Sequence, residues 1–323
     1  MKKVILAIAA VVALAACSNE ETLVESPREA IGFGNPFIEN ATRVANDSSY
    51  SGTKELTSFK VYGTVTGNSN SVLLYNGNDV TGKIGDAVWG CTGDPQYWIP
   101  NCSYKFYAIA DATSVSPADA MPTTITYNEN TTANGDLMLA IVDDTTNAQA
   151  TPSKGNPVKF TFTHLLSKAK FSFTKPAYSN TRYTFTVKNI KFVDAYKQGV
   201  YTIASGNWGS QAVKGELTFG NLEGNITTTN ATTGLESYNE RQFVPATYTA
   251  SNPLTISFDV VMMLDGKEFS TVNHTKTFPA EGEYAFTKNK AYDFNVVLGD
   301  NNTITFTVEE LAGWDSKTDI SIP

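Results

Sequence analysis

The sequence of 323 residues has little of the side-chain chemistry on which enzymes rely. It contains two histidines, His164 and His274, and three cysteines. Acid–base catalysis and transition-metal binding draw mainly on histidine, cysteine and convergent carboxylates. No G-x-S-x-G elbow and no calcium-loop pattern is present either. We therefore expect no enzymatic activity, no catalytic residue, no metal site and no cofactor.

Basic residues are scarce as well. Lys and Arg number 24 against 32 Asp and Glu, a formal net charge of −8, and both signs are scattered along the chain. A surface that binds nucleic acid needs clustered basic side chains to displace the counterions of the phosphates. We therefore expect no nucleic-acid partner.

No apolar run reaches the roughly 20 residues that a membrane-spanning helix needs. The run 4–16 follows Lys2 and Lys3 and ends in Leu14-Ala15-Ala16-Cys17. A short apolar run after a positive start is typical of a secretory signal peptide, so residues 1–16 are expected to be removed on export. The last four residues resemble a bacterial lipobox, which implies a lipid on Cys17 that anchors the chain in the outer membrane. Ordinary cleavage, with Cys17 as an incidental thiol, is the alternative.

Cys91 and Cys102 are the other two cysteines, and ten residues separate them. Export would place them in an oxidising compartment, where cysteines commonly pair. A disulfide between them would add roughly 3 kcal/mol in the chain-entropy model. We predict this disulfide; two reduced buried thiols are the alternative.

Alternation of apolar and polar residues is the dominant pattern after residue 56. It is clear in residues 59–65, 104–109, 158–162, 170–173 and 254–263. A period of two rich in Thr, Tyr, Phe and Val is typical of strands with one buried face. Gly and Asn clusters such as 76–79 and Asp265-Gly266 are predicted turns. The sequence thus predicts an all-β fold of sandwiches or barrels.

A turn-rich stretch, residues 151–157, lies near the middle of the chain between strand-like runs. We place a domain boundary there, giving an N-terminal domain of residues 17–155 and a C-terminal domain of residues 156–323. Trp89, Tyr97 and Trp98 precede this boundary. They suit either a sugar-binding platform or the core of a sandwich, and the core is favoured because large aromatics mostly supply buried area.

Several segments together resemble the fimbrillin family of Bacteroidetes, the subunits of type V pili. They are the lipobox at Cys17, residues 30–33 leading to residues 41–43, the strand 104–109, and the segments 136–140 and 160–171, followed by the lone Trp314. The resemblance implies two tandem transthyretin-like β-sandwich domains. It also implies an N-terminal strand that a protease removes after an arginine, so that a neighbour's strand fills the groove.

Under this resemblance, Arg43 is the preferred cleavage site, ahead of Arg28. Ile31, Phe33 and Phe37 are separated by even numbers, so we expect all three to point inward from the removable strand, residues 30–43. The candidate donor strands carry Ile304, Phe306, Val308, Ile320 and Ile322.

The resulting prediction is a subunit of adhesive fimbriae at the cell outer membrane. Its expected partners are other fimbrial subunits, the outer membrane through the lipid before cleavage, and a host or bacterial receptor. The alternative is a surface lipoprotein that binds glycans and does not polymerise.

Overall fold

The protein, analysed as a computed structural model, is built from strands throughout its described part. The structure describes residues 29–38, 56–83, 85–130, 135–143, 156–175, 182–209, 213–222, 226, 235–236, 240–298, 304–311 and 314. These residues form twenty-one β-strands. None of them belongs to a helix that could cross a membrane. The predicted all-β fold is confirmed.

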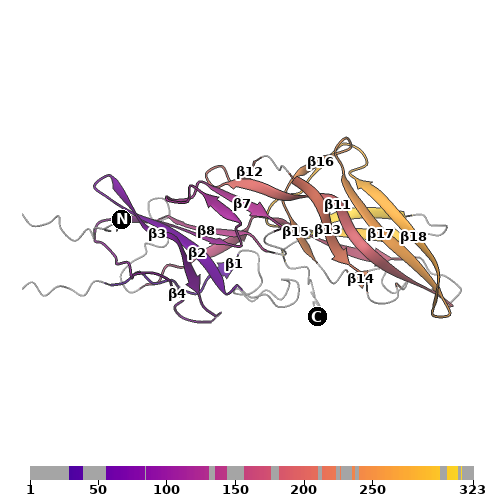
Figure 1. The fold of residues 1–323 in the computed structure, drawn as a ribbon, viewed down its shortest axis with the longest axis horizontal. Coiled ribbons are helices and arrows are strands. Elements are labelled where there is room, and N and C mark those ends of the chain that lie inside the picture. The colour runs from indigo at the N-terminus through magenta and orange to yellow at the C-terminus, as the bar shows by residue number, and fades with distance from the viewer. Residues whose placement is uncertain are drawn as a thin grey trace, which may run out of the picture.

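Seven strands form the N-terminal sheet, at the indigo end of the elongated molecule in Figure 1. In spatial order they are β1 (Phe37–Ile38), β9 (Thr161–His164), β8 (Met138–Asp143), β5 (Ser103–Ala110), β2 (Ser58–Gly67), β3 (Asn70–Thr81) and β4 (Gly90–Cys91). Strand β1 runs parallel to β9, and the other neighbouring strands are antiparallel.

The β11 sheet takes its name from its longest strand, β11 (Tyr183–Thr202). Its path is β18 (Lys267–Phe278), β17 (Leu254–Leu264), β11, β7 (Thr124–Asn128) and β6 (Ser114–Ser116), while β12 (Asn207–Trp208) and β13 (Val213–Gly220) also pair with β11. Because β7 and β6 come from the first half of the chain, β11 joins segments from both halves in one sheet.

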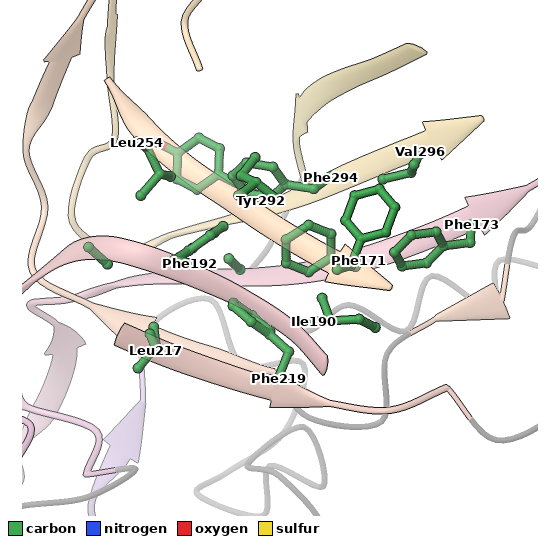
Figure 2. Close-up of a cluster of buried hydrophobic side chains, with 14 of the residues drawn as sticks. Phe171, Phe173, Ile190, Phe192, Leu217, Phe219, Leu254, Tyr292, Phe294 and Val296 are labelled. Carbon is green, nitrogen blue, oxygen red and sulfur yellow. The ribbon is translucent and has the colours of Figure 1, made fainter. Parts of the chain in front are cut away.

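The β10 sheet faces the β11 sheet. Its strands are β14 (Leu235–Glu236), β10 (Ser167–Thr174), β20 (Lys290–Leu298) and β21 (Ile304–Glu310), with β15 (Arg241–Phe243) also paired to β10. A separate two-stranded sheet holds β16 (Thr247–Thr249) and β19 (Glu283–Ala285). Between the β10 and β11 sheets lies a phenylalanine-rich core (Figure 2), in which the ring of Phe192 is centred 5.6 Å from Phe171 and 5.1 Å from Phe294. Two sheets packed over one apolar layer form a β-sandwich.

The N-terminal sheet extends past the domain boundary predicted at residue 155. Val158 is bridged to Phe33, in the first described segment of the chain, and Phe160 and Phe162 are fully buried in the core of the N-terminal sheet. That sheet therefore continues to His164 at the end of β9. The turn-rich stretch thus precedes the last strand of this sheet, because long-range pairing decides to which sheet a strand belongs.

Candidate functional site

The first described segment, residues 29–38, closes the N-terminal sheet and is called the closing segment below. Phe33 forms a parallel bridge with Val158, just before β9, and an antiparallel bridge with Trp89, just before β4. Since β9 and β4 lie near opposite ends of the sheet order, the closing segment joins the two sides of one sheet. It belongs to the sheet and is not a loose tail.

One wall of the site is formed by residues 158–162. The Val158 amide donates to the Gly32 carbonyl over 2.8 Å, and the Gly34 amide donates to the Val158 carbonyl over 2.9 Å. Further along, the Phe37 amide donates to the Phe160 carbonyl over 2.8 Å. This wall binds the closing segment as a parallel neighbour.

The second wall is formed by residues 89–98. The Ile31 amide donates to the Gln96 carbonyl over 2.7 Å, the Trp98 amide donates to the Glu29 carbonyl over 3.0 Å, and the Trp89 amide donates to the Phe33 carbonyl over 2.8 Å. The two walls thus contribute six backbone groups whose partners lie on the closing segment. Without that segment these groups would need new partners, because buried backbone groups are nearly all hydrogen-bonded.

The side chains of the closing segment complete the core beneath it. Phe33 is fully buried, and Ile31 is 6% exposed. The Phe33 ring stacks on Phe160, with centroids 5.8 Å apart, and meets the edges of Tyr75 at 5.3 Å and Phe106 at 6.2 Å. Removing this segment would uncover the centre of an aromatic cluster, which makes it the candidate functional site.

The inward orientation predicted for Phe37 is wrong, whereas Ile31 and Phe33 do point inward. Phe37 is 44% exposed, and its neighbour Ile38 packs against the core instead. Residues 34–36 are not paired as a strand, and Pro36 is buried there. The inward-facing positions therefore shift from odd to even numbers across this break, because alternation holds only within a continuous strand.

The predicted disulfide is also wrong, since Cys91 and Cys102 both carry free thiols. Cys91 pairs with Val80, which pairs with Phe59 at the start of β2. Cys102 adjoins Ser103, which pairs with Thr66 at the other end of β2. At ~3.3 Å per residue, Phe59 and Thr66 lie about 23 Å apart along β2. The two cysteines, which sit beside these opposite ends, are therefore well beyond the roughly 7 Å that a disulfide tolerates between Cα atoms.

The aromatic residues considered as a sugar platform are mostly occupied in the core. Trp89 is 1% exposed and stacks on Phe59, and Trp98 contacts the ring of Tyr104 edge-on at 4.7 Å. Tyr97 is 41% exposed. One exposed ring does not make a platform, and this placement favours the core interpretation.

Of the candidate donor residues, the structure describes those in β21, namely Ile304, Phe306 and Val308. Strand β21 pairs along its whole length with β20, and Ile304 and Val308 pack against the phenylalanine-rich core. Phe306 pairs through its backbone with Val296. Arg43, Cys17, Ile320 and Ile322 lie outside the described residues.

The second wall is the functional part that the sequence did not predict. Residues 89–98 carry Gly93 and Pro95, which suggested only a loop. Their backbone groups pair like a sheet edge only because the closing segment, more than fifty residues earlier in the chain, lies beside them. A local sequence pattern cannot predict a partner that far away.

Comparisons with known proteins agree with this architecture. A family model described as fimbrillin-like matches residues 42–314, which is 273 of the 323 residues. A crystal structure of a fimbrial protein from Bacteroides vulgatus is similar at 17% identity and a TM-score of 0.59, covering 88% of this chain and 99% of that one. Proteins provisionally assigned to cell adhesion from Bacteroides uniformis and Bacteroides ovatus give 16% and 13% identity and TM-scores of 0.52 and 0.53, each over 88% of this chain and 98% of theirs. No curated protein matches the sequence.

Proposed function

Because the chain belongs to the fimbrillin-like family, we propose that it is a structural subunit of cell-surface fimbriae that polymerises by exchanging its closing segment for a strand of a neighbouring subunit. The single observation that carries this proposal is the position of Phe33. Its side chain fills the aromatic core while its backbone bridges both walls of the N-terminal sheet.

The steps before assembly follow from the N-terminal sequence. The chain is exported as a lipoprotein with its lipid on Cys17, which holds it at the outer membrane. A protease then cleaves after Arg43, between the end of β1 and the start of β2. This single cut separates the closing segment from the rest of the chain, which retains both walls.

The groove that remains suits an incoming strand. Its walls offer the six backbone groups now bonded to the closing segment, the pattern on which strand addition depends. Burying side chains at the positions of Ile31, Phe33 and Ile38 contributes about 1.5–3 kcal/mol each before ordering costs. The resulting contact is long-lived enough for a polymer, and the assembled fimbria would support adhesion.

The donor strand comes from the C-terminal part of a neighbouring subunit, either from β21 or from the residues around Ile320 and Ile322. Strand β21 is already paired to β20 in its own sheet, so its donation would require a break in that sheet. The segment after Trp314 is therefore our preferred donor.

A reversible cross-link tests the proposal directly. Ala30 and Tyr97 form an antiparallel bridge flanked by the Ile31–Gln96 and Trp98–Glu29 hydrogen bonds, so they are a non-hydrogen-bonded pair. Such pairs bring Cα atoms to about 4.5 Å, within disulfide range. We would introduce Ala30→Cys and Tyr97→Cys in a Cys91→Ser, Cys102→Ser background.

After cleavage, the oxidised variant should keep its closing segment on a non-reducing gel and form no ladder of subunits. Reduction should release the segment and restore the ladder. Ala30→Cys alone, and Arg43→Ala with and without reductant, are the matched controls. Ladders of undiminished intensity from the oxidised, fully cross-linked variant would refute exchange at this groove.

A further inference from the structure

Residues 315–323, called the tail below, begin close to one wall of the groove. The Trp314 ring stacks on the imidazole of His164, with ring centroids 4.0 Å apart, and both side chains are buried. His164 is the last residue of β9, the strand that continues the wall of residues 158–162. Trp314 therefore fixes the base of the tail at the end of this wall.

Release of the closing segment opens one edge of β9 to a new strand. β8 pairs with the other edge, and β1 with the rest of the closing segment lies along this one. The amide and the carbonyl of Val158 both point into the groove, because they are bonded to the Gly32 carbonyl and the Gly34 amide. In an antiparallel strand, a residue directly opposite Val158 would exchange both hydrogen bonds with it.

The length of the tail matches the length of this edge. Six residue steps separate His164 from Val158, and six steps also separate Trp314 from Ile320. At ~3.3 Å per residue, each run spans about 20 Å when extended. A tail that runs back along β9 from Trp314 is antiparallel to it and brings Ile320 level with Val158. Ile320 then takes the place of Phe33, which is bridged to Val158 in the uncleaved chain.

The same register turns the apolar side chains of the tail toward the core. Side chains alternate between the two faces of a strand, so Ile320 and Ile322 share the face on which Trp314 lies. Ile322 falls at the place of Ile31. Along the wall, the residues at alternate positions are buried, namely Val158, Phe160, Phe162 and His164. The two isoleucines therefore face the core that the closing segment leaves open.

Ser321 suits the outer side of the groove, where the two walls come close together. In this register it takes the place of Gly32, at which a Cβ atom would lie 3.9 Å from both Pro157 Cβ and Val88 Cγ1. The backbone of Gly32 does not have a positive φ, so space and not strain limits what fits there. Such contacts on both sides leave room for a small side chain, and serine is one.

The tail fills the groove less well than the closing segment does. Ile320 is smaller than Phe33, and the remaining inward positions of the tail carry a serine and a threonine. Asp319 comes to the place of Gly34, where a Cβ atom would lie only 3.3 Å from Pro157 Cγ. The tail therefore does not displace the closing segment from the uncleaved chain, and a better-fitting strand can displace the tail.

We propose that, after the closing segment has left, the tail inserts into the groove of its own chain, antiparallel to β9 and with Ile320 at the place of Phe33. The proposal rests on the proposed function, because cleavage after Arg43 is what frees the groove. A self-inserted subunit keeps its aromatic core covered and does not polymerise. Because a short tether acts at an effective concentration in the millimolar range, a neighbour's strand enters only at high subunit concentration or with a better fit.

A pair of cysteines traps the inserted tail. Ser321→Cys and Pro157→Cys would be introduced in a Cys91→Ser, Cys102→Ser background. The separation of 3.9 Å between a Cβ at the place of Gly32 and Pro157 Cβ lies within the range of about 3.5–4.5 Å that a disulfide needs. Ser316→Cys with Pro157→Cys is the matched control. It should form no disulfide, because Ser316 lies five residues farther from the trapped position.

Isotope labelling distinguishes insertion into the same chain from insertion into a neighbour. Nitrogen-15-labelled and unlabelled chains, both cleaved after Arg43 and freed of the closing segment in mild urea, would be mixed in equal amounts and oxidised. At about 1 μM, far below the effective concentration of the tail, mass spectrometry should find almost only disulfides within one label. Mixed-label disulfides should increase at higher concentration. If half of the disulfides are mixed at every concentration, the tail enters only neighbours, and self-insertion is wrong while strand exchange stands.

Shortening the tail tests the register. Deletion of residues 315–317 reduces the reach from Trp314 to Ile320 by about 10 Å, so same-label disulfides should disappear while mixed-label ones persist at high concentration. Same-label disulfides in undiminished yield would refute the proposal. If the tail forms no disulfide at all although wild-type subunits form ladders, self-insertion is wrong and β21 is the donor. If wild-type subunits form no ladder and the cysteine pair forms no disulfide, the proposed function fails together with this proposal.

Discussion

The indole ring of Trp314 lies parallel to the imidazole of His164, with ring centroids 4.0 Å apart and 9° between the planes. Both side chains are buried. His164 Nδ1 lies 2.8 Å from Asp136 Oδ2, and the Lys168 ammonium sits 5.2 Å from the centre of the Trp314 ring. Because His164 ends β9 while Trp314 follows β21, this stack fastens the C-terminal part of the chain to the N-terminal sheet.

Loss of this stack should be costly. Trp314→Ala is expected to lower the free energy of unfolding by about 3–5 kcal/mol, as truncation of a fully buried aromatic residue typically does. Trp314→Phe keeps a ring over His164 and should cost clearly less. Urea unfolding followed by circular dichroism measures both. A loss below about 1 kcal/mol for Trp314→Ala would show that the surrounding residues collapse into the space.

Local patterns in the sequence predicted the strands well and the irregularities less well. The Asp265-Gly266 turn is where it was expected, with φ of 51° and 78° joining β17 to β18. The Gly-Asn cluster 76–79, however, lies inside β3, where Gly77 has a φ of 78° and the register against β2 shifts. A glycine with positive φ serves a turn and a β-bulge equally well, and only the pairing partner tells them apart.

The candidate site could be predicted only in part for a similar reason. The two-residue spacing of Ile31 and Phe33 correctly indicated that both side chains point inward, although this part of the segment pairs through isolated bridges and only Phe37–Ile38 forms a strand. The walls come from residues 89–98 and 158–162, which are far from the closing segment in sequence, so no short stretch of the chain contained the whole groove. The outward turn of Phe37 depends on the break at Pro36, which residue spacing alone does not show.

Gly63 in β2 offers a test of how tightly the core beneath the closing segment is packed. A Cβ atom there would lie 2.6 Å from Phe106 Cδ1 and 3.1 Å from Tyr75 Cδ2, so one of these rings would have to move. We expect Gly63→Ala to lower the free energy of unfolding by about 1–3 kcal/mol through overpacking. Gly90→Ala is the control, since its Cβ would meet only the Thr81 carbonyl at 3.8 Å. Thermal unfolding compares the two, and equal melting temperatures would contradict the expected crowding.

The Cys91 thiol should report how well this end of β4 is shielded from water. Its pKa of about 11, raised by burial from an ordinary value of 9.0, leaves about a hundredfold less thiolate at pH 8 than a freely exposed thiol has. In a Cys17→Ser, Cys102→Ser background, alkylation should therefore be slow at pH 8 and accelerate about tenfold per pH unit until near pH 11. The same chain in guanidinium chloride should level off near pH 9. Identical pH profiles for the folded and unfolded chains would contradict burial of this thiol.

Phe33 and Phe37 provide a matched pair of substitutions within the closing segment. Phe33 is fully buried among three aromatic rings, whereas Phe37 is 44% exposed beside β9. We expect Phe33→Ala to lower the free energy of unfolding of the uncleaved chain by about 3–5 kcal/mol and Phe37→Ala by less than about 1 kcal/mol.

The same two substitutions test whether the buried ring of Phe33 holds the closing segment in its groove after cleavage. In the chain cleaved after Arg43, Phe33→Ala should shorten the time for which the segment stays bound, because its largest buried side chain is gone. Phe37→Ala should leave that time nearly unchanged. Size-exclusion chromatography of the cleaved protein, followed by mass spectrometry of the released peptide, measures it. If both variants release the segment at the wild-type rate, Phe33 does not hold it in the groove, and closure of the sheet rests on the backbone hydrogen bonds alone.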